Sequence, residues 1–284
     1  MRESANTRYW HELFVSTQGA GDSKDVCTSV VDGHSILVFD ALIDQDECEQ
    51  LTARSRCSSK EAFSDPNSSS RVRLPVTQIE QEALCENILL RVLVLLRQQL
   101  PLLCQQLFGD LISSACCIRN PAIKFSPGEP AINVYRTGGR FKPHEDKQSL
   151  TVLVSLSCPS AFTGGGTGFW SIEDRGPRSH GSVATSEPTV VVRANAGTAL
   201  VFTGAVTHAG LPVTSGERMV FVSSFSPMEK SGSTHHDSVF RAARRRTVLN
   251  VEQNAMIQRA LALRKADQRP RRERIADRKA ADRT

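Results

Sequence analysis

The stretch that decides the fold is AINVYRTGGRFKPHEDKQSLTVLVSL, residues 131–156. Residues 131–135 and 150–156 have the composition of strands, and the glycine-containing residues 136–140 predict a turn after the first of them. The triplet His144-Glu145-Asp146 lies between the two strands, at a strand edge. In an extended segment, residues two apart point to the same side. We therefore expect His144 and Asp146 to face one side and Glu145 the other.

A second segment places another histidine between two strands. Residues 197–203 predict a strand opened by glycine, residues 204–207 a turn, and residues 218–225 a further strand, with His208 between them. Alternation along the last strand puts four residues on one face, namely Arg218, Val220, Val222 and Ser224. Arg218 thus begins a row of side chains that can point into a barrel.

The residue types at these positions indicate oxidative chemistry. Two histidines and one carboxylate can hold a redox-active iron on one face and leave its other positions open. An arginine ten residues beyond His208 can bind a carboxylate co-substrate through two parallel hydrogen bonds. A further His-x-Asp match, at residues 235–237, lies in a polar stretch without a strand signal, and we interpret it as a solvated loop.

Taken in order along the chain, these motifs carry a family resemblance. The motifs are the strand at 133–135, the glycine turn at 138–141, the triplet, the glycine-rich run 164–169, the strand 197–202, His208 and Arg218. Together they resemble the iron(II), 2-oxoglutarate-dependent dioxygenases, nearest the prolyl 4-hydroxylase type. The resemblance covers about residues 33–227. It implies an α+β fold with a mainly β core, a double-stranded β-helix or jelly roll preceded by supporting helices.

The resemblance also implies roles for individual residues. Iron would be bound by His144, Asp146 and His208, and the far carboxylate of 2-oxoglutarate would be held by Arg218. Tyr135 matches a position near the iron end of 2-oxoglutarate, where its phenol can donate a hydrogen bond; the alternative is a half-buried strand tyrosine. Thr151 is a candidate contact to the co-substrate from the neighbouring strand.

The chain is expected to divide into three parts. These are a flexible N-terminal segment (1–32), a dioxygenase domain (33–227, with helical support at 33–120 and the jelly-roll core at 121–227) and a basic tail (228–284). Within the helical support, residues 36–39 predict a strand, Asp44 a helix cap, and the apolar run 88–96 a long helix broken at Pro101. That run is shorter than the roughly 20 residues of a membrane-spanning helix, so no membrane partner is expected.

The cysteines and the first residues of the chain predict a cellular compartment. The eight cysteines are scattered without a Cys-x-x-Cys pair, and residues 1–15 lack the pattern of a secretory signal. We therefore expect reduced, mostly buried thiols and a cytoplasmic protein, with the nucleus as an open alternative.

The basic excess of the chain lies in its tail. Residues 241–284 carry 14 Lys and Arg and five Asp and Glu, a net charge of +9 against +5 for the whole chain. Such a tail could contact nucleic acid, an acidic protein or a nuclear import receptor. We favour a solvated helix or a disordered tail, because acidic residues are interspersed and no aromatic side chain is present to stack on bases.

These observations together predict an Fe(II)- and 2-oxoglutarate-dependent dioxygenase that uses molecular oxygen to hydroxylate a carbon centre and releases succinate and CO2. The favoured substrate is a prolyl or related residue of a protein or peptide; a small molecule stays open, because variable loops set specificity. The resemblance adds ascorbate as a reductant. Two alternatives are an oxidative demethylase of nucleic acid, whose enzymes usually carry paired arginines farther beyond the distal histidine, and a non-catalytic binding module that uses the basic tail.

Overall fold

The computed structural model describes residues 14–16, 24–63, 70–108, 123–171 and 187–227. A large sheet contains β1 (Phe14–Ser16), β2 (Ile36–Phe39), β3 (Arg71–Pro75), β4 (Ile123–Phe125), β5 (Ala131–Tyr135), β7 (Leu150–Ser155), β11 (Ala199–Phe202) and β14 (Arg218–Pro227). A smaller sheet contains β6 (Phe141–His144), β9 (Thr167–Trp170), β10 (Val190–Val192) and β12 (Thr207–Gly210). The strands β8 (Phe162–Gly164) and β13 (Val213–Gly216) pair with each other. The helices are α2 (Lys24–Val31), α3 (Gln45–Ala62), α4 (Glu82–Gln99) and α5 (Pro101–Phe108), with short 3-10 helices at Val76–Gln78 and Pro159–Ala161.

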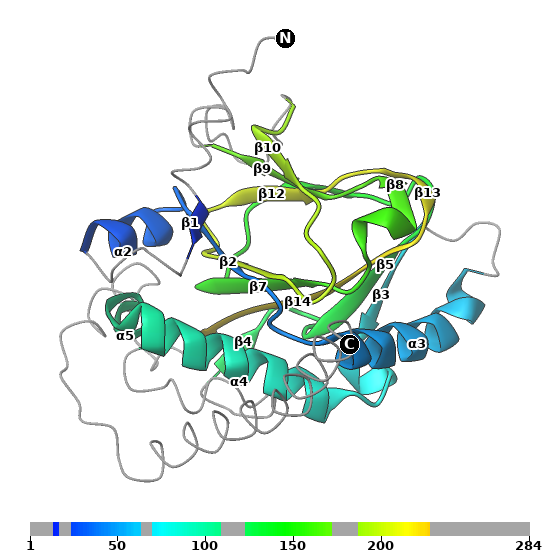
Figure 1. Ribbon diagram of the computed structural model, residues 1–284, viewed down its shortest axis with the longest axis horizontal. Coiled ribbons are helices and arrows are strands. Elements are labelled where there is room, and N and C mark those ends of the chain that lie inside the picture. Colours follow the sequence, from blue (N-terminus) through cyan, green and yellow to red (C-terminus); the bar gives the residue numbers. More distant parts are fainter. Residues whose placement is uncertain (1–13, 17–23, 64–69, 109–122, 172–186, 228–284) are drawn as a thin grey trace, which may run out of the picture.

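The two sheets face each other, and α3, α4 and α5 lie on the far side of the large sheet (Figure 1). The large sheet has the order β1-β2-β11-β7-β14-β5-β3, with β4 also paired to β14, and the smaller sheet has the order β10-β9-β12-β6. Neighbouring strands are antiparallel except for the pair β1–β2. This mainly antiparallel arrangement is the predicted jelly roll.

Alternation along the strands divides the core in two. In β14, Met219 and Phe221 belong to the cluster that packs against the helices, whereas Val220 and Val222 belong to the cluster between the sheets. The same division holds in β5, where Val134 faces the helices and Tyr135 faces the smaller sheet. The two-faced strand predicted at 218–225 is therefore confirmed, and the face that carries Arg218 points into the barrel.

The helix boundaries follow local chemistry. The Asp44 carboxylate accepts the Glu47 N–H at 2.9 Å and the Glu47 carboxylate accepts the Asp44 N–H at 3.1 Å, a capping box at the start of α3. The predicted break at Pro101 is confirmed: α4 ends at Gln99 and α5 begins at Pro101. None of the helices in the described ranges is long and apolar enough to span a membrane.

The expected flexible segment 1–32 is wrong for residues 14–16 and 24–31. The first range forms β1 beside β2, and the second forms α2, which buries Cys27 and Val30 in the core and places the Cys27 thiol 2.7 Å from the Gln106 side chain on α5. The range expected to be helical support also supplies β2 and β3 to the large sheet, so the sheet begins well before residue 121. The predicted tail, 228–284, lies outside the described residues.

The described cysteines are free thiols. Four are buried and two are exposed, the buried set being Cys27, Cys48, Cys85 and Cys104 and the exposed set Cys57 and Cys158. Burial, aided by neighbouring carboxylates, raises the pKa of Cys48 and of Cys85 to about 12. These two thiols therefore stay protonated near neutral pH. Cys116 and Cys117 lie outside the described residues.

Candidate active site

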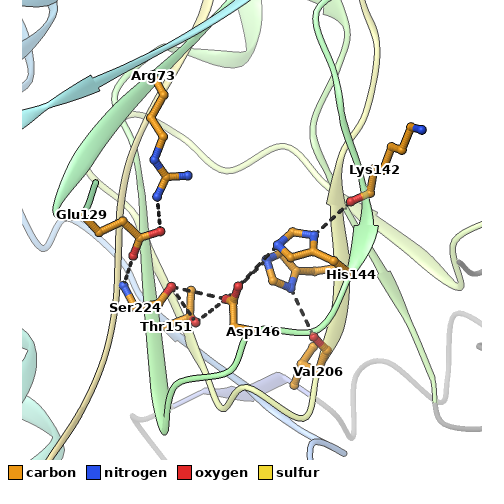
Figure 2. Close-up of polar contacts among 9 residues, drawn as sticks. Arg73, Glu129, Lys142, His144, Asp146, Thr151, Val206 and Ser224 are labelled. Carbon is orange, nitrogen blue, oxygen red and sulfur yellow. Dashed lines mark hydrogen bonds and ion pairs between the residues drawn. The ribbon is translucent and has the colours of Figure 1, made fainter. Parts of the chain in front are cut away.

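The structure brings His144, Asp146 and His208 together, with one ligand atom of each within 4.8 Å of the others. His144 ends β6 and pairs directly with His208 on β12, and Asp146 follows two residues after His144. The Nε2 atom of His144 lies 3.3 Å from Asp146 Oδ1, and that of His208 lies 3.7 Å from Asp146 Oδ2 (Figure 2). The middle residue of the triplet points elsewhere, since Glu145 accepts a hydrogen bond from the Thr207 hydroxyl at 3.2 Å.

Backbone carbonyls orient both imidazole rings. His144 Nδ1 lies 2.9 Å from the Lys142 carbonyl, and His208 Nδ1 lies 3.1 Å from the Val206 carbonyl. Because a carbonyl oxygen only accepts, each Nδ1 carries the proton and each Nε2 turns a lone pair toward Asp146. Lone pairs of two imidazoles and a carboxylate repel one another at this range unless a cation lies among them. The donor set therefore fits a metal ion.

The charge state of the cluster also suits a metal. Burial lowers the pKa of His208 to about 4, although Asp146 opposes the shift. Burial alone would raise the pKa of Asp146, but its contact with His144, the nearby His208 and the Thr151 hydroxyl outweigh burial and hold that pKa below its usual range. At neutral pH, His208 is thus a neutral donor beside an ionised carboxylate, which is the protonation state a metal ligand needs.

Hydroxyl groups fix the carboxylate from behind. The fully buried Thr151 donates to Asp146 Oδ2 at 2.5 Å, and Ser224 lies 3.4 Å from the same oxygen (Figure 2). Thr151 is not among the residues that line the cavity. Its hydroxyl is directed at Asp146, because strand pairing sets Thr151 opposite Ser224 beside that carboxylate. A contact between Thr151 and the co-substrate stays a prediction.

A glycine allows the loop that carries Asp146 to pack against the turn after β11. A Cβ at Gly204 would lie 2.5 Å from the Asp146 carbonyl oxygen and 2.3 Å from that of Gln148. Either approach is far inside van der Waals contact, so any larger residue must displace the loop. Gly204 thus helps to set the position of the carboxylate.

Arg218 lies in the same cavity as the three ligand candidates, a space of about 210 Å³. Its side chain is 6% exposed, and its Nη2 donates to the Thr167 hydroxyl at 2.8 Å. Burial lowers the pKa of Arg218, and within the described part of the chain no carboxylate lies within ion-pair distance of it. A buried cation without an acidic partner is unfavourable. The cavity is therefore suited to an anionic ligand.

Tyr135 lies beside Arg218. The two residues are opposite each other on β5 and β14, and the Arg218 guanidinium carbon is 5.3 Å from the centre of the tyrosine ring. The ring thus lies at the arginine end of the cavity, whereas the resemblance implied the iron end. The phenol extends to β12, where a Cβ at Gly210 would come 3.0 Å from its hydroxyl oxygen. A contact between Tyr135 and a co-substrate stays a prediction.

Several polar residues of the cavity were not predicted from the sequence. They are Asn133 on β5, Thr167 on β9 and the ion pair Arg73–Glu129. Asn133 carried a usable signal, because it is the polar residue of an otherwise apolar strand and shares a face with Tyr135. The ion pair joins residues 56 positions apart, and no local pattern indicates it.

One family model and several solved structures are similar to this chain. Residues 130–226 match the family model described as the 2OG-Fe(II) oxygenase superfamily. The chain is similar to the structure of a viral collagen prolyl hydroxylase from Paramecium bursaria Chlorella virus-1 in complex with 2-oxoglutarate, at 18% identity over 70% of this chain and 99% of that one, with a TM-score of 0.40. A prolyl-4-hydroxylase from Pseudomonas putida is 17% identical over 72% of this chain and 100% of that one, with a TM-score of 0.40. HygX from Streptomyces hygroscopicus, bound to nickel, 2-oxoglutarate and hygromycin B, is 14% identical over 80% of this chain and 96% of that one, with a TM-score of 0.45.

No curated protein matches the chain. The family match spans β5 to β14 and contains all three ligand candidates and Arg218. The part of the chain that carries the site, residues 130–226, is therefore similar to the 2OG-Fe(II) oxygenase superfamily.

Proposed function

We propose that this protein hydroxylates a carbon centre of a prolyl or related residue in a protein or peptide. The observation that carries the oxygenase activity is the shared cavity, in which a buried arginine without a described acidic partner lies in the same space as two histidines and a carboxylate. A metal site and an anion site within one cavity are what a metal enzyme with an acidic co-substrate requires.

His144, Asp146 and His208 would hold iron(II) on the side of the smaller sheet. When iron and 2-oxoglutarate are bound, they supply the oxidation of an unactivated carbon by molecular oxygen, with release of succinate and CO2. The protein residues bind and orient the reactants. Phe141 and Phe202 pack edge-on against the two ligand histidines, with ring centroids 4.4 Å from His144 and 4.8 Å from His208. These contacts restrict the rotation of both imidazole rings.

Arg218 would hold the distal carboxylate of 2-oxoglutarate. A planar guanidinium donates two parallel charge-assisted hydrogen bonds, and Thr167 already fixes one of its nitrogens. The charges also balance: iron(II), the Asp146 carboxylate and a dianionic co-substrate sum to −1, and Arg218 brings the assembly to neutrality. Apolar side chains of Leu153 and Val220 line the cavity and favour this neutral assembly over separated charges.

The prolyl preference rests on the order of motifs along the chain, which resembles the prolyl 4-hydroxylase type from residue 133 to residue 218. Ascorbate as reductant belongs to the same proposal. Free thiols among the described cysteines support a reducing compartment, the cytoplasm or the nucleus, which imaging of the tagged protein would test.

Succinate formation tests the activity. Protein purified without oxygen is supplied with iron(II), 2-oxoglutarate and air, alone and with prolyl peptides or free amino acids, and mass spectrometry detects the added oxygen atom. We expect succinate from the wild type and none from His144→Ala. A wild type that binds neither iron(II) nor 2-oxoglutarate would contradict the oxygenase proposal. Turnover with small molecules but not with peptides would contradict the prolyl proposal alone.

A further inference from the structure

The cavity extends beyond the space between the metal ligands and Arg218. Its other wall, on the side of β5 and β3, includes Asn133, Arg73 and Glu129. Figure 2 shows Arg73 of β3 and Glu129, which lies just before β5, across the site from His144. A co-substrate that joins the metal to Arg218 on β14 leaves this wall, one and two strands away, open to a second molecule.

Asn133 is the residue of this wall that most needs a ligand. Its side chain lines the cavity and is 6% exposed, and its Oδ1 atom is enclosed. Within the described ranges, that oxygen has no hydrogen-bond partner. Buried polar atoms are almost always paired in folded proteins. Its direct neighbours across the sheet are Val220 and Arg73, and the valine offers no hydrogen bond.

Arg73 and Glu129 form a fixed, neutral pair next to this amide. Glu129 accepts hydrogen bonds from Arg73 Nη2 and from the backbone N–H of Ser224, which holds the carboxylate in place. The Nε atom of Arg73 is buried and, among the described residues, has no partner. Since the two charges cancel, the wall presents unsatisfied hydrogen-bonding groups without a net charge.

A third feature limits which substrates suit this wall. Arg71 lies at the edge of the same cavity, with its guanidinium carbon 4.3 Å above the centre of the Phe141 ring. Arg71 and Phe141 both line the cavity on this side. A free amino acid would bring both an ammonium and a carboxylate to a buried wall whose Arg73 is already neutralised, whereas a peptide group brings no charge.

We propose that Asn133, with Arg73 beside it, binds a backbone amide of the substrate and thereby selects peptides over free amino acids. A peptide group has one acceptor and one donor, which match the donor and the acceptor of the Asn133 amide, and its carbonyl oxygen can also accept from Arg73 Nε. This inference rests on the proposed function, because it names the substrate class of the same cavity. Recognition of an amide is nevertheless separable from hydroxylation of proline.

The test uses Asn133→Leu, which keeps the size of the side chain and removes its hydrogen bonds. The matched control is Thr163→Val, the same kind of change at an exposed residue of β8, outside the cavity. The probes are two N-acetylated, C-amidated tripeptides, Ala-Pro-Gly and Ala-Ala-Gly, and free L-proline. Four quantities are measured for each protein: 2-oxoglutarate affinity in the presence of iron(II) without oxygen, peptide affinity in the same state, hydroxylation, and the melting temperature.

We expect Asn133→Leu to weaken the affinity for both blocked peptides by about three- to twentyfold, the loss of one or two neutral hydrogen bonds. The affinity for 2-oxoglutarate and the melting temperature should stay at the wild-type values, and Thr163→Val should change none of the four quantities. A loss of 2-oxoglutarate affinity instead would reassign Asn133 to the co-substrate and overturn the inference. Peptide binding that does not depend on Asn133, or no binding of blocked peptides at all, would overturn it as well.

The two proposals fail in different ways. If both blocked peptides bind through Asn133 but the prolyl peptide gains no oxygen, amide recognition stands and the prolyl function falls. If the prolyl peptide is hydroxylated equally well by the wild type and by Asn133→Leu, the function stands and the role of Asn133 falls.

Discussion

Replacing Thr151 by valine should weaken metal binding without removing any metal ligand. The change keeps the shape of a fully buried side chain and deletes the hydroxyl that donates to Asp146 Oδ2 at 2.5 Å. A hydrogen bond to a charged group contributes about 1.5–3 kcal/mol. Without it, the hydroxyl contact that the carboxylate retains among the described residues is that of Ser224, at 3.4 Å, and the carboxylate can rotate away from the histidines.

The expected consequence is a loss of iron(II) affinity of about ten- to a hundredfold, the range seen when groups that orient metal ligands are removed. Anaerobic titration with iron(II), or with cobalt(II) followed by its visible absorption, measures this quantity. Thermal unfolding of the metal-free protein should change much less, because valine fills the same space.

Ser223→Ala is the matched control. Ser223 precedes Ser224 on β14, is fully buried, and its hydroxyl has no hydrogen-bond partner in the described structure. The change deletes a buried hydroxyl from β14, the strand that pairs with the β7 strand of Thr151, without removing a contact to Asp146. Equal metal affinities for the wild type, Thr151→Val and Ser223→Ala would refute the argument that Thr151 fixes the carboxylate.

Three further predictions follow from the site and the core. Arg218→Ala should raise the 2-oxoglutarate requirement about ten- to a hundredfold, and Arg218→Lys less, because one charged hydrogen-bonded contact worth about 1.5–3 kcal/mol is lost or weakened; an unchanged requirement would exclude Arg218 from the site. Gly204→Ala should lower metal affinity by displacing the Asp146 loop, since the added Cβ would lie 2.3 Å from a backbone oxygen; unaltered metal titration would show that the loop yields at no cost. Because the thiolate is the reactive form, alkylation of the folded protein at pH 8 should modify the exposed thiols of Cys57 and Cys158 well before those of Cys48 and Cys85, whose pKa is raised to about 12; peptide mapping with equal labelling of both pairs would contradict the assigned burial.

Local patterns were sufficient for much of the barrel. The strand predicted at 131–135 is β5 with the same ends, and the strand predicted at 218–225 is β14, which runs on to Pro227. Each begins or ends at a turn signal and alternates with period two, so its inward face follows from the sequence. The helix cap at Asp44 and the break at Pro101 were equally predictable, because both depend on the chemistry of one or two residues.

Contacts between distant strands were not predictable in this way. Thr151 was a candidate contact to the co-substrate, and the sequence did not predict its hydrogen bond to Asp146, which arises because β7 pairs with β14 and turns that hydroxyl toward the carboxylate. The segment before residue 33 was expected to be flexible, but its residues 24–31 form a helix that buries Val30 in the core and places the Cys27 thiol against Gln106 of α5, 79 positions away. Such partners depend on which surfaces meet after folding.

The sequence by itself determined the types and order of the metal-ligand candidates, the position of Arg218 and the alternation that points it inward, because these are properties of residue spacing within single strands. Only the tertiary structure decided that the ligand atoms lie within 4.8 Å of one another, that Arg218 is buried in the same cavity, and that Asn133 and the Arg73–Glu129 pair form its other wall. The physical reason is that the spacing of residues within one strand fixes the direction of each side chain. Its neighbours, its burial and its pKa depend instead on the register between strands that lie far apart in the sequence.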